Sequence, residues 1–279
     1  MQIPIILETD FGYNDPYVGI MKGVIKNINP GAEIIDLTHG IPEFDIGSGA
    51  YALYTSFKYF PENSVFTIVI DPGVGSSRKP ILIDACKQFF IGPDNGIIYP
   101  VVESCSQAGS FHYIRIIDPE KLLIKVSEIT GKPVFSLSKT FHGRDIFAPS
   151  AALLSLNVNP EEFAPTTIKP NNIVKYNLYH SVEKNGLICF RPIYIDRFGN
   201  IALSIAFKEF ASILESYGEI SFETIEGGKY TGVIGSTFSD VPSGSIVLYS
   251  NSFGFLEIGI NKGSAVDVIG KPDLICFKH

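Results

Sequence analysis

A carboxylate, a guanidinium and an imidazole occur in this sequence at places where folding could bring them together. Asp71 follows the apolar run of residues 65–70, Arg78 closes the glycine-containing loop after it, and His142 lies far along the chain. An aspartate can accept a proton from water, an arginine can fix that carboxylate with two hydrogen bonds, and a histidine can orient the same water. The three side chains are therefore candidates to position and activate water for attack on a substrate.

Each of these residues also has a simpler interpretation. An ion pair between Asp71 and Arg78 could merely pin the turn between them, and His142 could be a helix-capping or core histidine. The loop itself contains Gly73 and Gly75, which can take positive φ or let a ligand approach the backbone closely. These residues alone leave open whether the three side chains act together.

Two further polar residues follow predicted strands in the first half of the chain. Asp10 comes after the apolar run 3–7, and Asn95 lies in a turn after the run 88–92. In open α/β sheets, ligands bind in the crevice beyond the carboxyl ends of the strands. We therefore expect Asp10 and Asn95 to lie near Asp71 and to contact a substrate.

Two loops in the second half combine polar residues with an aromatic ring. Such sequences can be simple hairpin turns, because Asp, Gly and Asn favour turns for local reasons. They could equally contact a flat heterocycle by stacking and by hydrogen bonds to its edge. The residues concerned are Asp196, Phe198 and Asn200 in the first loop, and Ser252, Phe253 and Glu257 in the second.

The polar residues of the first half must be positioned by alternating strands and helices. Strand-like runs at residues 3–7, 33–37 and 65–70 alternate with helical patterns at 17–27 and 46–57. This alternation is typical of a parallel sheet with helices on its faces. Residues 80–84 and 88–92 resemble the two strands of a hairpin. The sequence predicts an N-terminal α/β domain with a mostly parallel sheet, spanning residues 1–165.

The pattern changes after Pro160. A polar connection at residues 161–172 is followed by short alternating runs that glycine turns separate. Such spacing is typical of a small antiparallel barrel or sandwich. We therefore predict a C-terminal antiparallel β-barrel domain at residues 166–279.

Composition excludes several partners. The 279 residues carry a formal net charge of −7 and no cluster of lysine and arginine, which argues against nucleic acid or an anionic membrane as the partner. No apolar run reaches the roughly 18 residues of a membrane span. The N-terminus lacks the basic lead and cleavage site of a signal peptide. We therefore predict a cytoplasmic location.

The four cysteines are scattered, at positions 86, 105, 189 and 276, and none forms a C-x-x-C pair. We therefore expect reduced thiols rather than a zinc or redox motif. The histidines at positions 39, 112 and 180 have no partners at metal-ligand spacing, so we expect each to be structural or exposed. The phosphate-binding P-loop, the H-E-x-x-H zinc motif and the G-x-S-x-G nucleophile motif are also missing. The sequence thus predicts neither a metal nor a cofactor.

Taken together, five motifs in order closely resemble the S-adenosyl-L-methionine (SAM) hydroxide adenosyltransferases, the adenosine-forming SAM hydrolases related to fluorinase and chlorinase. The resemblance covers nearly the whole chain. The motifs are Thr9-Asp10-Phe11-Gly12, then Asp71-Pro72-Gly73-Val74-Gly75 with Arg78, then Phe141-His142-Gly143-Arg144-Asp145, then Asp196 with Phe198-Gly199-Asn200, and then Asn251-Ser252-Phe253-Gly254 with Glu257.

The resemblance implies attack of water or hydroxide on the 5′ carbon of SAM, giving adenosine and L-methionine without a cofactor. It also implies a homotrimer whose active site lies between the N-domain of one subunit and the C-domain of the next. In this family Asp71, Arg78 and His142 match the water-activating triad. The matched substrate contacts are Asp10 for the ribose hydroxyls, Asp196 for the methionine ammonium, Asn200 and Ser252 near the adenine and the methionine end, and Phe141, Phe198 and Phe253 as apolar walls. Asn95 and Glu257 complete the predicted substrate-binding set.

Two other functions stay open at this point. A metal-dependent phosphohydrolase could use Asp10, Asp15, Asp71, His142 and Asp145, and a non-catalytic SAM or adenosine sensor could retain the fold. A halide nucleophile is disfavoured, because the halogenating relatives dispense with the Asp-Arg-His set that this chain keeps.

Overall fold

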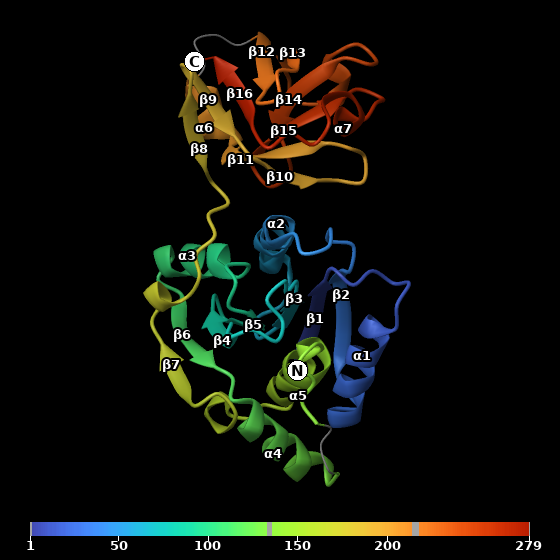
Figure 1. Cartoon of the computed structure of the whole chain (residues 1–279), viewed down its shortest axis with the longest axis vertical. Coiled ribbons are helices and arrows are strands. Elements are labelled where there is room, and N and C mark those ends of the chain that lie inside the picture. The colour runs from blue at the N-terminus through green and yellow to red at the C-terminus, as the bar shows by residue number, and fades with distance from the viewer. Residues whose placement is uncertain (1, 133–135, 214–217, 279) are drawn as a thin grey trace. The chain divides into compact units, whose positions relative to one another are not determined.

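The computed structural model describes residues 2–132, 136–213 and 218–278. The chain divides into two compact units, Met1–Tyr176 and Asn177–His279. Figure 1 shows the helices and the sheet of the first unit and the strand-rich second unit. The sequence predicted a boundary at residues 165 and 166. In the structure a strand at residues 166–168 still belongs to the first sheet, and the first unit continues to Tyr176.

The first unit contains a seven-stranded sheet in the order β2-β1-β3-β5-β4-β6-β7. The neighbours β2, β1, β3 and β5 are parallel, whereas β4, β6 and β7 each pair antiparallel. Their bounds are β1 Pro4–Thr9, β2 Glu33–Thr38, β3 Val65–Val69, β4 Pro80–Ala85, β5 Gln88–Pro93, β6 Phe111–Ile116 and β7 Thr166–Ile168. The prediction of a mostly parallel sheet was therefore wrong, because the sheet is mixed.

The cause of the mixed sheet lies in a hairpin. Cys86 and Lys87 join β4 to β5, and both have positive φ, at 50° and 60°. A two-residue turn with two positive φ values matches the twist of antiparallel strands. The hairpin thus inserts β4 against β5, and β6 and β7 continue the antiparallel half.

Helices cover both faces of this sheet. Helix α1 packs with α5 against one face, where Met21, Ile25 and Ala151 join a core with Leu7 and Val69. On the other face α2 lies so close that a Cβ on its Gly49 would meet Ile70 and Ile97. The bounds are α1 Tyr17–Ile28, α2 Ile46–Ser56, η1 Phe57–Tyr59, α3 Tyr99–Gln107, α4 Pro119–Thr130, η2 Gly143–Phe147 (a π-helical turn), α5 Ala148–Ser155, η3 Pro160–Glu162 and η4 Pro170–Asn172.

The second unit contains a nine-stranded sheet in the order β10-β11-β15-β14-β13-β12-β16-β9-β8. It curls round one core, in which Phe190, Phe210, Phe222 and Phe277 pack together. The bounds are β8 Ser181–Lys184, β9 Leu187–Phe190, β10 Pro192–Ile195, β11 Ile201–Ala206, α6 Phe207–Ile213, β12 Glu219–Thr224, β13 Lys229–Ile234, η5 Phe238–Asp240, β14 Ile246–Ser250, β15 Phe255–Ile260, α7 Ala265–Ile269 and β16 Ile275–Lys278. The pairs are antiparallel as predicted, except that β13 and β14 are parallel.

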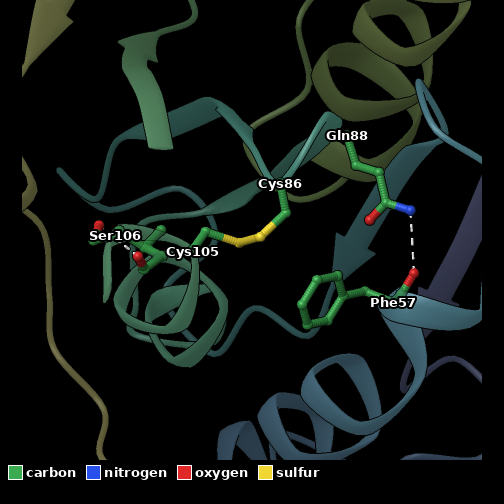
Figure 2. The surroundings of a disulfide bond; sticks show 6 residues. Phe57, Cys86, Gln88, Cys105 and Ser106 are labelled. Carbon is green, nitrogen blue, oxygen red and sulfur yellow. Dashed lines mark hydrogen bonds between the residues drawn. A yellow bond between two sulfur atoms is a disulfide. The ribbon is translucent and has the colours of Figure 1, made fainter. Parts of the chain in front are cut away.

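All four cysteines are paired, so the expectation of reduced thiols was wrong for this structure. Cys189 in β9 lies directly opposite Cys276 in β16, and the two form a disulfide across 87 residues. Cys86, at the β4–β5 turn, forms a disulfide with Cys105 in α3 (Figure 2). Neither pairing depends on a short sequence motif, because the fold brings distant residues together.

Helices in residues 2–132, 136–213 and 218–278 are too short or too polar to cross a membrane.

Candidate active site

The loop at residues 71–78 is held against the segment that leads to His142. Its Gly75 has φ +79°, and a Cβ there would lie 2.5 Å from the backbone oxygen of Lys139. Only glycine combines this conformation with so close an approach. The contact brings the loop of Asp71 and Arg78 to within three residues of His142 along the chain.

Asp71, Arg78 and His142 are in direct contact, although 64 residues separate Arg78 from His142. The Arg78 Nε lies 2.9 Å from both Asp71 oxygens, and Nη2 also donates to Oδ2 of Asp71. The same Nη2 lies 2.8 Å from Nδ1 of His142. The Asp71 and Arg78 side chains are only 6% and 8% exposed. The pair is therefore a shielded clamp that also holds the imidazole.

The clamp determines which nitrogen of His142 carries the proton. Arginine always donates, so the Nδ1 that faces it must accept, and the neutral ring then carries its proton on Nε2. Burial and the charge of Arg78 lower the pKa of His142, against smaller opposing effects of Asp71 and Asp145. Nη1 of Arg78 is buried and has no hydrogen-bond partner among the described residues. Nε2 is thus the N–H donor that the neutral His142 ring presents beside the Asp71–Arg78 pair.

The π-helical turn η2 begins directly after His142 and supports the site. The ring of Phe147 lies under the Arg78 guanidinium, with 5.2 Å between the guanidinium carbon and the ring centroid. Asp145 accepts from the backbone N–H of Ser138 at 2.7 Å and pairs with Arg144. The hydrogen bonds of Asp145 with Ser138 and Arg144 therefore stabilise the turn.

Asp10 directly follows β1 and approaches the same region. One of its oxygens accepts from the backbone N–H of Phe44 at 2.9 Å. Burial raises the pKa of Asp10, and the negative charge of Asp71 adds to that effect, while the N–H of Phe44 opposes it. The two carboxylates are thus near enough to affect each other. Phe44 has φ +62°, a left-handed conformation that is strained for an aromatic residue.

Three aromatic rings pack together between the segment of Asp10 and the segment of His142. Phe11, which follows Asp10, packs against Tyr17 and Phe141 with centroids 5.5 and 6.0 Å away, and Tyr17 and Phe141 lie 5.2 Å apart. Phe141 was expected to form an apolar wall, and it lies half-buried directly before His142. The rings of Phe11 and Tyr17 join it.

Asn95 lies beside the residue that precedes Asp71, near that carboxylate as expected. Its side-chain nitrogen donates to the carbonyl of Ile70 at 2.8 Å, and its oxygen accepts from the N–H of Ile97. Both ends of the amide are therefore engaged with backbone. Asn95 anchors the residue before Asp71, and it contributes to the site by fixing that carboxylate.

In the second unit the loop at residues 196–200 is built on Asp196. One oxygen of Asp196 accepts from the N–H groups of Phe198 and Asn200, and the other accepts from the Asn200 side chain, all at 2.9 Å. The Phe198 ring is 76% exposed. The loop is thus a stable turn that presents an aromatic ring.

Glu257 lies on β15 and accepts from the Tyr249 hydroxyl and from Nδ2 of Asn251. Burial raises its pKa, while these two hydrogen bonds oppose the shift and the charge of Asp196 adds to it. The carboxylates of Glu257 and Asp196 are therefore close enough for electrostatic repulsion between them.

The two polar–aromatic loops are at opposite ends of one strand pair. Ile201 lies opposite Ile258, and Ala206 lies opposite Phe255, so each loop precedes its strand at a different end. Ser252 and Phe253 are exposed in the second loop. A ligand spanning both loops would have to lie along β11 and β15, because an extended strand rises about 3.3 Å per residue.

His39 has partners that its position in the sequence did not reveal. Its ring is buried, with Nδ1 2.8 Å from the Thr9 hydroxyl and Nε2 3.1 Å from Asp36. The expectation that His39 is structural or exposed is confirmed in its first form, because the ring is buried and hydrogen-bonded. A sequence signal of these partners was that His39 follows β2 just as Asp10 follows β1.

The described ranges 2–132, 136–213 and 218–278 contain no group of three or more His, Cys, Asp or Glu side chains placed to share one metal ion.

An α/β unit in which a buried aspartate after β3 contacts an arginine and a half-buried histidine, joined to a β-rich unit, defines an enzyme-like site for a polar reactant. A family model described as the SAM hydroxide adenosyltransferase N-terminal domain matches residues 5–164, and the C-terminal domain model matches residues 192–271. The chain belongs to the SAM hydroxide adenosyltransferase family.

Individual relatives agree over almost the full length. A protein from Thermus thermophilus named (R)-S-adenosyl-L-methionine hydrolase is 31% identical over 96% of this chain and 95% of its own. A protein of the same name from Methanocaldococcus jannaschii is 36% identical over 91% of this chain and 87% of its own. The crystal structure of an uncharacterized conserved protein from Thermotoga maritima superposes with TM-score 0.83 at 32% identity, covering 99% of this chain and all of that one.

Proposed function

We propose that this protein hydrolyses SAM to adenosine and L-methionine. The observation that carries the proposal is the contact of Asp71, Arg78 and His142 at the end of β3, in a chain whose relatives are named SAM hydrolases. None of those names points to a phosphohydrolase or to a sensor.

The donors of the site suit a hydroxide nucleophile. Hydrogen bonds to the charged form of a group favour that form, so an oxygen that accepts from His142 Nε2 loses a proton more readily than bulk water. Asp71 is the nearest carboxylate to receive that proton and pass it to solvent. In this scheme His142 orients the nucleophile as a donor and is not the base.

The reaction balances without a cofactor. The oxygen forms a bond to C5′ of SAM, the bond from C5′ to sulfur breaks, and sulfur keeps the electron pair to become the neutral thioether of methionine. The sulfonium is already a good leaving group, so expelling it needs neither an acid nor a metal. Positioning the two reactants can supply roughly 7–11 kcal/mol in the best cases, and general-base help adds about 10²–10⁴-fold.

The substrate contacts follow from the charges of SAM. Asp10 would accept hydrogen bonds from the ribose hydroxyls, and Asp196 would face the methionine ammonium. A carboxylate at the sulfur would oppose loss of the positive charge, so an apolar surround is expected there. The ring of Phe141, packed with Phe11 and Tyr17, suits that requirement.

We also propose a homotrimer with the active site formed by the first unit of one subunit and the second unit of the next. Exposed aromatic residues support the proposal. Tyr13, Phe44 and Tyr17 are 67%, 63% and 44% exposed near Asp10, and Phe198 and Phe253 are 76% and 45% exposed on the second unit. Exposed apolar residues grouped near polar ones mark interaction sites.

The test is to incubate purified protein with SAM, with and without a strong chelator, and to quantify adenosine and methionine by chromatography. Equal release of both products in the two samples is the expected result. SAM binding without turnover would instead establish the sensor, and loss of activity with the chelator would favour metal-dependent hydrolysis.

A further inference from the structure

A buried polar network fixes the loop that carries Asp10. Thr9 is fully buried at the end of β1, and its hydroxyl accepts from the backbone N–H of Phe11 at 3.2 Å. The single proton of that hydroxyl is then available to Nδ1 of His39, 2.8 Å away. The backbone oxygen of His39 also accepts from the N–H of Gly12 at 2.8 Å. His39 thus contacts the chain on both sides of Asp10.

The second ring nitrogen of His39 is held from β2. Nε2 lies 3.1 Å from Oδ1 of Asp36, an ion-pair distance without the geometry of a hydrogen bond. A carboxylate can only accept, so the neutral ring carries its proton on Nε2, and Nδ1 accepts from Thr9. Lys22 donates to the other oxygen of Asp36 at 2.7 Å. Burial alone would raise the pKa of Asp36, but its contacts with Lys22 and His39 outweigh burial and lower it. Asp36 is therefore a charged anchor for the ring.

Tyr13 contacts both His39 and Asp36. Its ring lies edge-on to the His39 ring, with centroids 5.0 Å apart and planes at 87°. Its hydroxyl donates to Asp36 at 3.2 Å. The loop from Thr9 to Tyr13 therefore contacts the pair of His39 and Asp36 at Thr9, Gly12 and Tyr13, with Asp10 between the first two contacts.

We propose that His39 is a positioning residue, which holds the loop of Thr9 to Tyr13 so that Asp10 meets the ribose hydroxyls of the substrate. This inference rests on the proposed function, because it assigns Asp10 to the ribose. The acceptor at Nδ1 matters most, because it receives the proton of the Thr9 hydroxyl, whose oxygen already accepts from the N–H of Phe11 on the far side of Asp10. His39 itself touches no substrate and acts through Thr9.

The test measures preference for the ribose diol. Binding of adenosine and of 2′,3′-dideoxyadenosine to the full-length protein is compared by calorimetry for wild type, Thr9→Val, His39→Asn and His39→Gln. Asparagine places an acceptor close to the position of Nδ1, whereas glutamine places its amide near Nε2. Loss of one neutral hydrogen bond is worth roughly tenfold. We expect Thr9→Val and His39→Gln to weaken adenosine about tenfold and to leave the dideoxy ligand within about twofold, with His39→Asn close to wild type.

Other outcomes overturn the inference in recognisable ways. Equal loss of both ligands in Thr9→Val and His39→Gln, with a lowered unfolding midpoint, would mean that His39 only stabilises the fold. An unchanged diol preference in both variants would mean that the network does not control Asp10. If wild type itself showed no preference for the diol, the ribose role of Asp10 would fail first, and His39 would have no ligand contact to position.

Discussion

At the scale of single residues, Arg78 determines what its neighbours can do. One guanidinium donates to both oxygens of Asp71 and to Nδ1 of His142. The carboxylate is thereby kept as an acceptor, and the imidazole is kept neutral with its proton directed away from the clamp. The sequence supplied the three residue types, but the division of roles follows only from which atoms face each other.

The donor role of His142 has a direct test. Glutamine can place an amide N–H near the position of Nε2 but cannot act as a base, whereas asparagine retains only an acceptor near Nδ1. We expect His142→Gln to keep more of the wild-type kcat for SAM than His142→Asn, because it keeps the donor. Steady-state kinetics on both variants, with SAM binding as a control, would measure this. Equal inactivity of the two, with binding intact, would return the role of base to His142.

Glu8 is a buried residue for which the proposed reaction has no use. It is 1% exposed in β1, and neither of its side-chain oxygens has a hydrogen-bond partner in the part of the chain that the structure describes. Burial raises the pKa of Glu8 well above its ordinary value. Folded Glu8 therefore keeps a proton that the unfolded chain loses above about pH 4.5, and each further unit of pH destabilises the fold.

We expect Glu8→Gln to remove this dependence. The variant should have nearly wild-type stability at pH 4 and should gain about 1.4 kcal/mol over wild type for each pH unit above 4.5, up to the folded pKa. Urea unfolding at pH 4, 5.5 and 7 would give the two curves. Parallel curves for the two proteins would show that Glu8 is not protonated in the folded state.

At the scale of elements, the site depends on how the loop at residues 71–78 packs. Gly75 has φ +79° and lies against the backbone oxygen of Lys139, so the loop and the segment before His142 have a fixed separation. Asn95 fixes the other side by holding the carbonyl of Ile70. The clamp therefore has supports from β3, from the turn after β5 and from the segment before η2.

Gly75→Ala should separate Arg78 from His142. The matched control is Gly109→Ala, because Gly109 has a similar φ of +66° but no atom lies within 4 Å of the position that its Cβ would take. Both variants should lose roughly 1–2 kcal/mol of stability through left-handed strain, and Gly75→Ala should lose more because its Cβ would also meet the backbone oxygen of Lys139. Only Gly75→Ala should also lose most of its kcat. Unfolding curves and steady-state kinetics on both variants would separate the loss of stability from the loss of kcat. Equal kcat in the two variants would show that the contact of Gly75 with Lys139 does not position Arg78.

Much of the element order could be predicted from local sequence. The strands ending before Asp10 and Asp71 and the hairpin at Cys86 follow from apolar runs and turn residues, and all three are present. The full antiparallel half of the sheet could not be predicted in this way, because β6 pairs with β4 through residues 26 to 35 apart and β7 pairs with β6 through residues 50 to 54 apart. Local patterns indicate strands but do not determine which strand each one will pair with.

The candidate site shows the same limit. Asp71 and Arg78 are close in sequence and could be paired by inspection, whereas the place of His142 depends on a contact between distant loops. His39 was set aside because it lacked metal-ligand spacing, and its partner Thr9 is 30 residues away. The substrate contact expected of Asn95 stays a prediction, and the sequence did not reveal that its amide also holds backbone at Ile70 and Ile97. Residue type indicates which chemistry is available, and the fold decides where it is used.

At the scale of the whole molecule, each unit contains one disulfide. Cys86–Cys105 closes a separation of 19 residues in the first unit, and Cys189–Cys276 closes 87 residues in the second. Disulfides are rare in a reducing cytosol outside hyperthermophiles. The cytoplasmic location therefore remains a prediction.

The two disulfides should stabilise their units by different amounts. By the chain-entropy relation the shorter cross-link stabilises by about 3 kcal/mol and the longer one by about 4.6 kcal/mol. Cys189→Ser with Cys276→Ser should therefore lower the unfolding midpoint of its unit more than Cys86→Ser with Cys105→Ser lowers that of the other. Calorimetry on both double variants, with wild type in a reducing agent as the reference for losing both bonds, would measure the difference. Thiol titration of unreduced wild type in denaturant is the independent check: it should find no reactive thiols, and four would show that the cysteines are free, as the sequence first indicated.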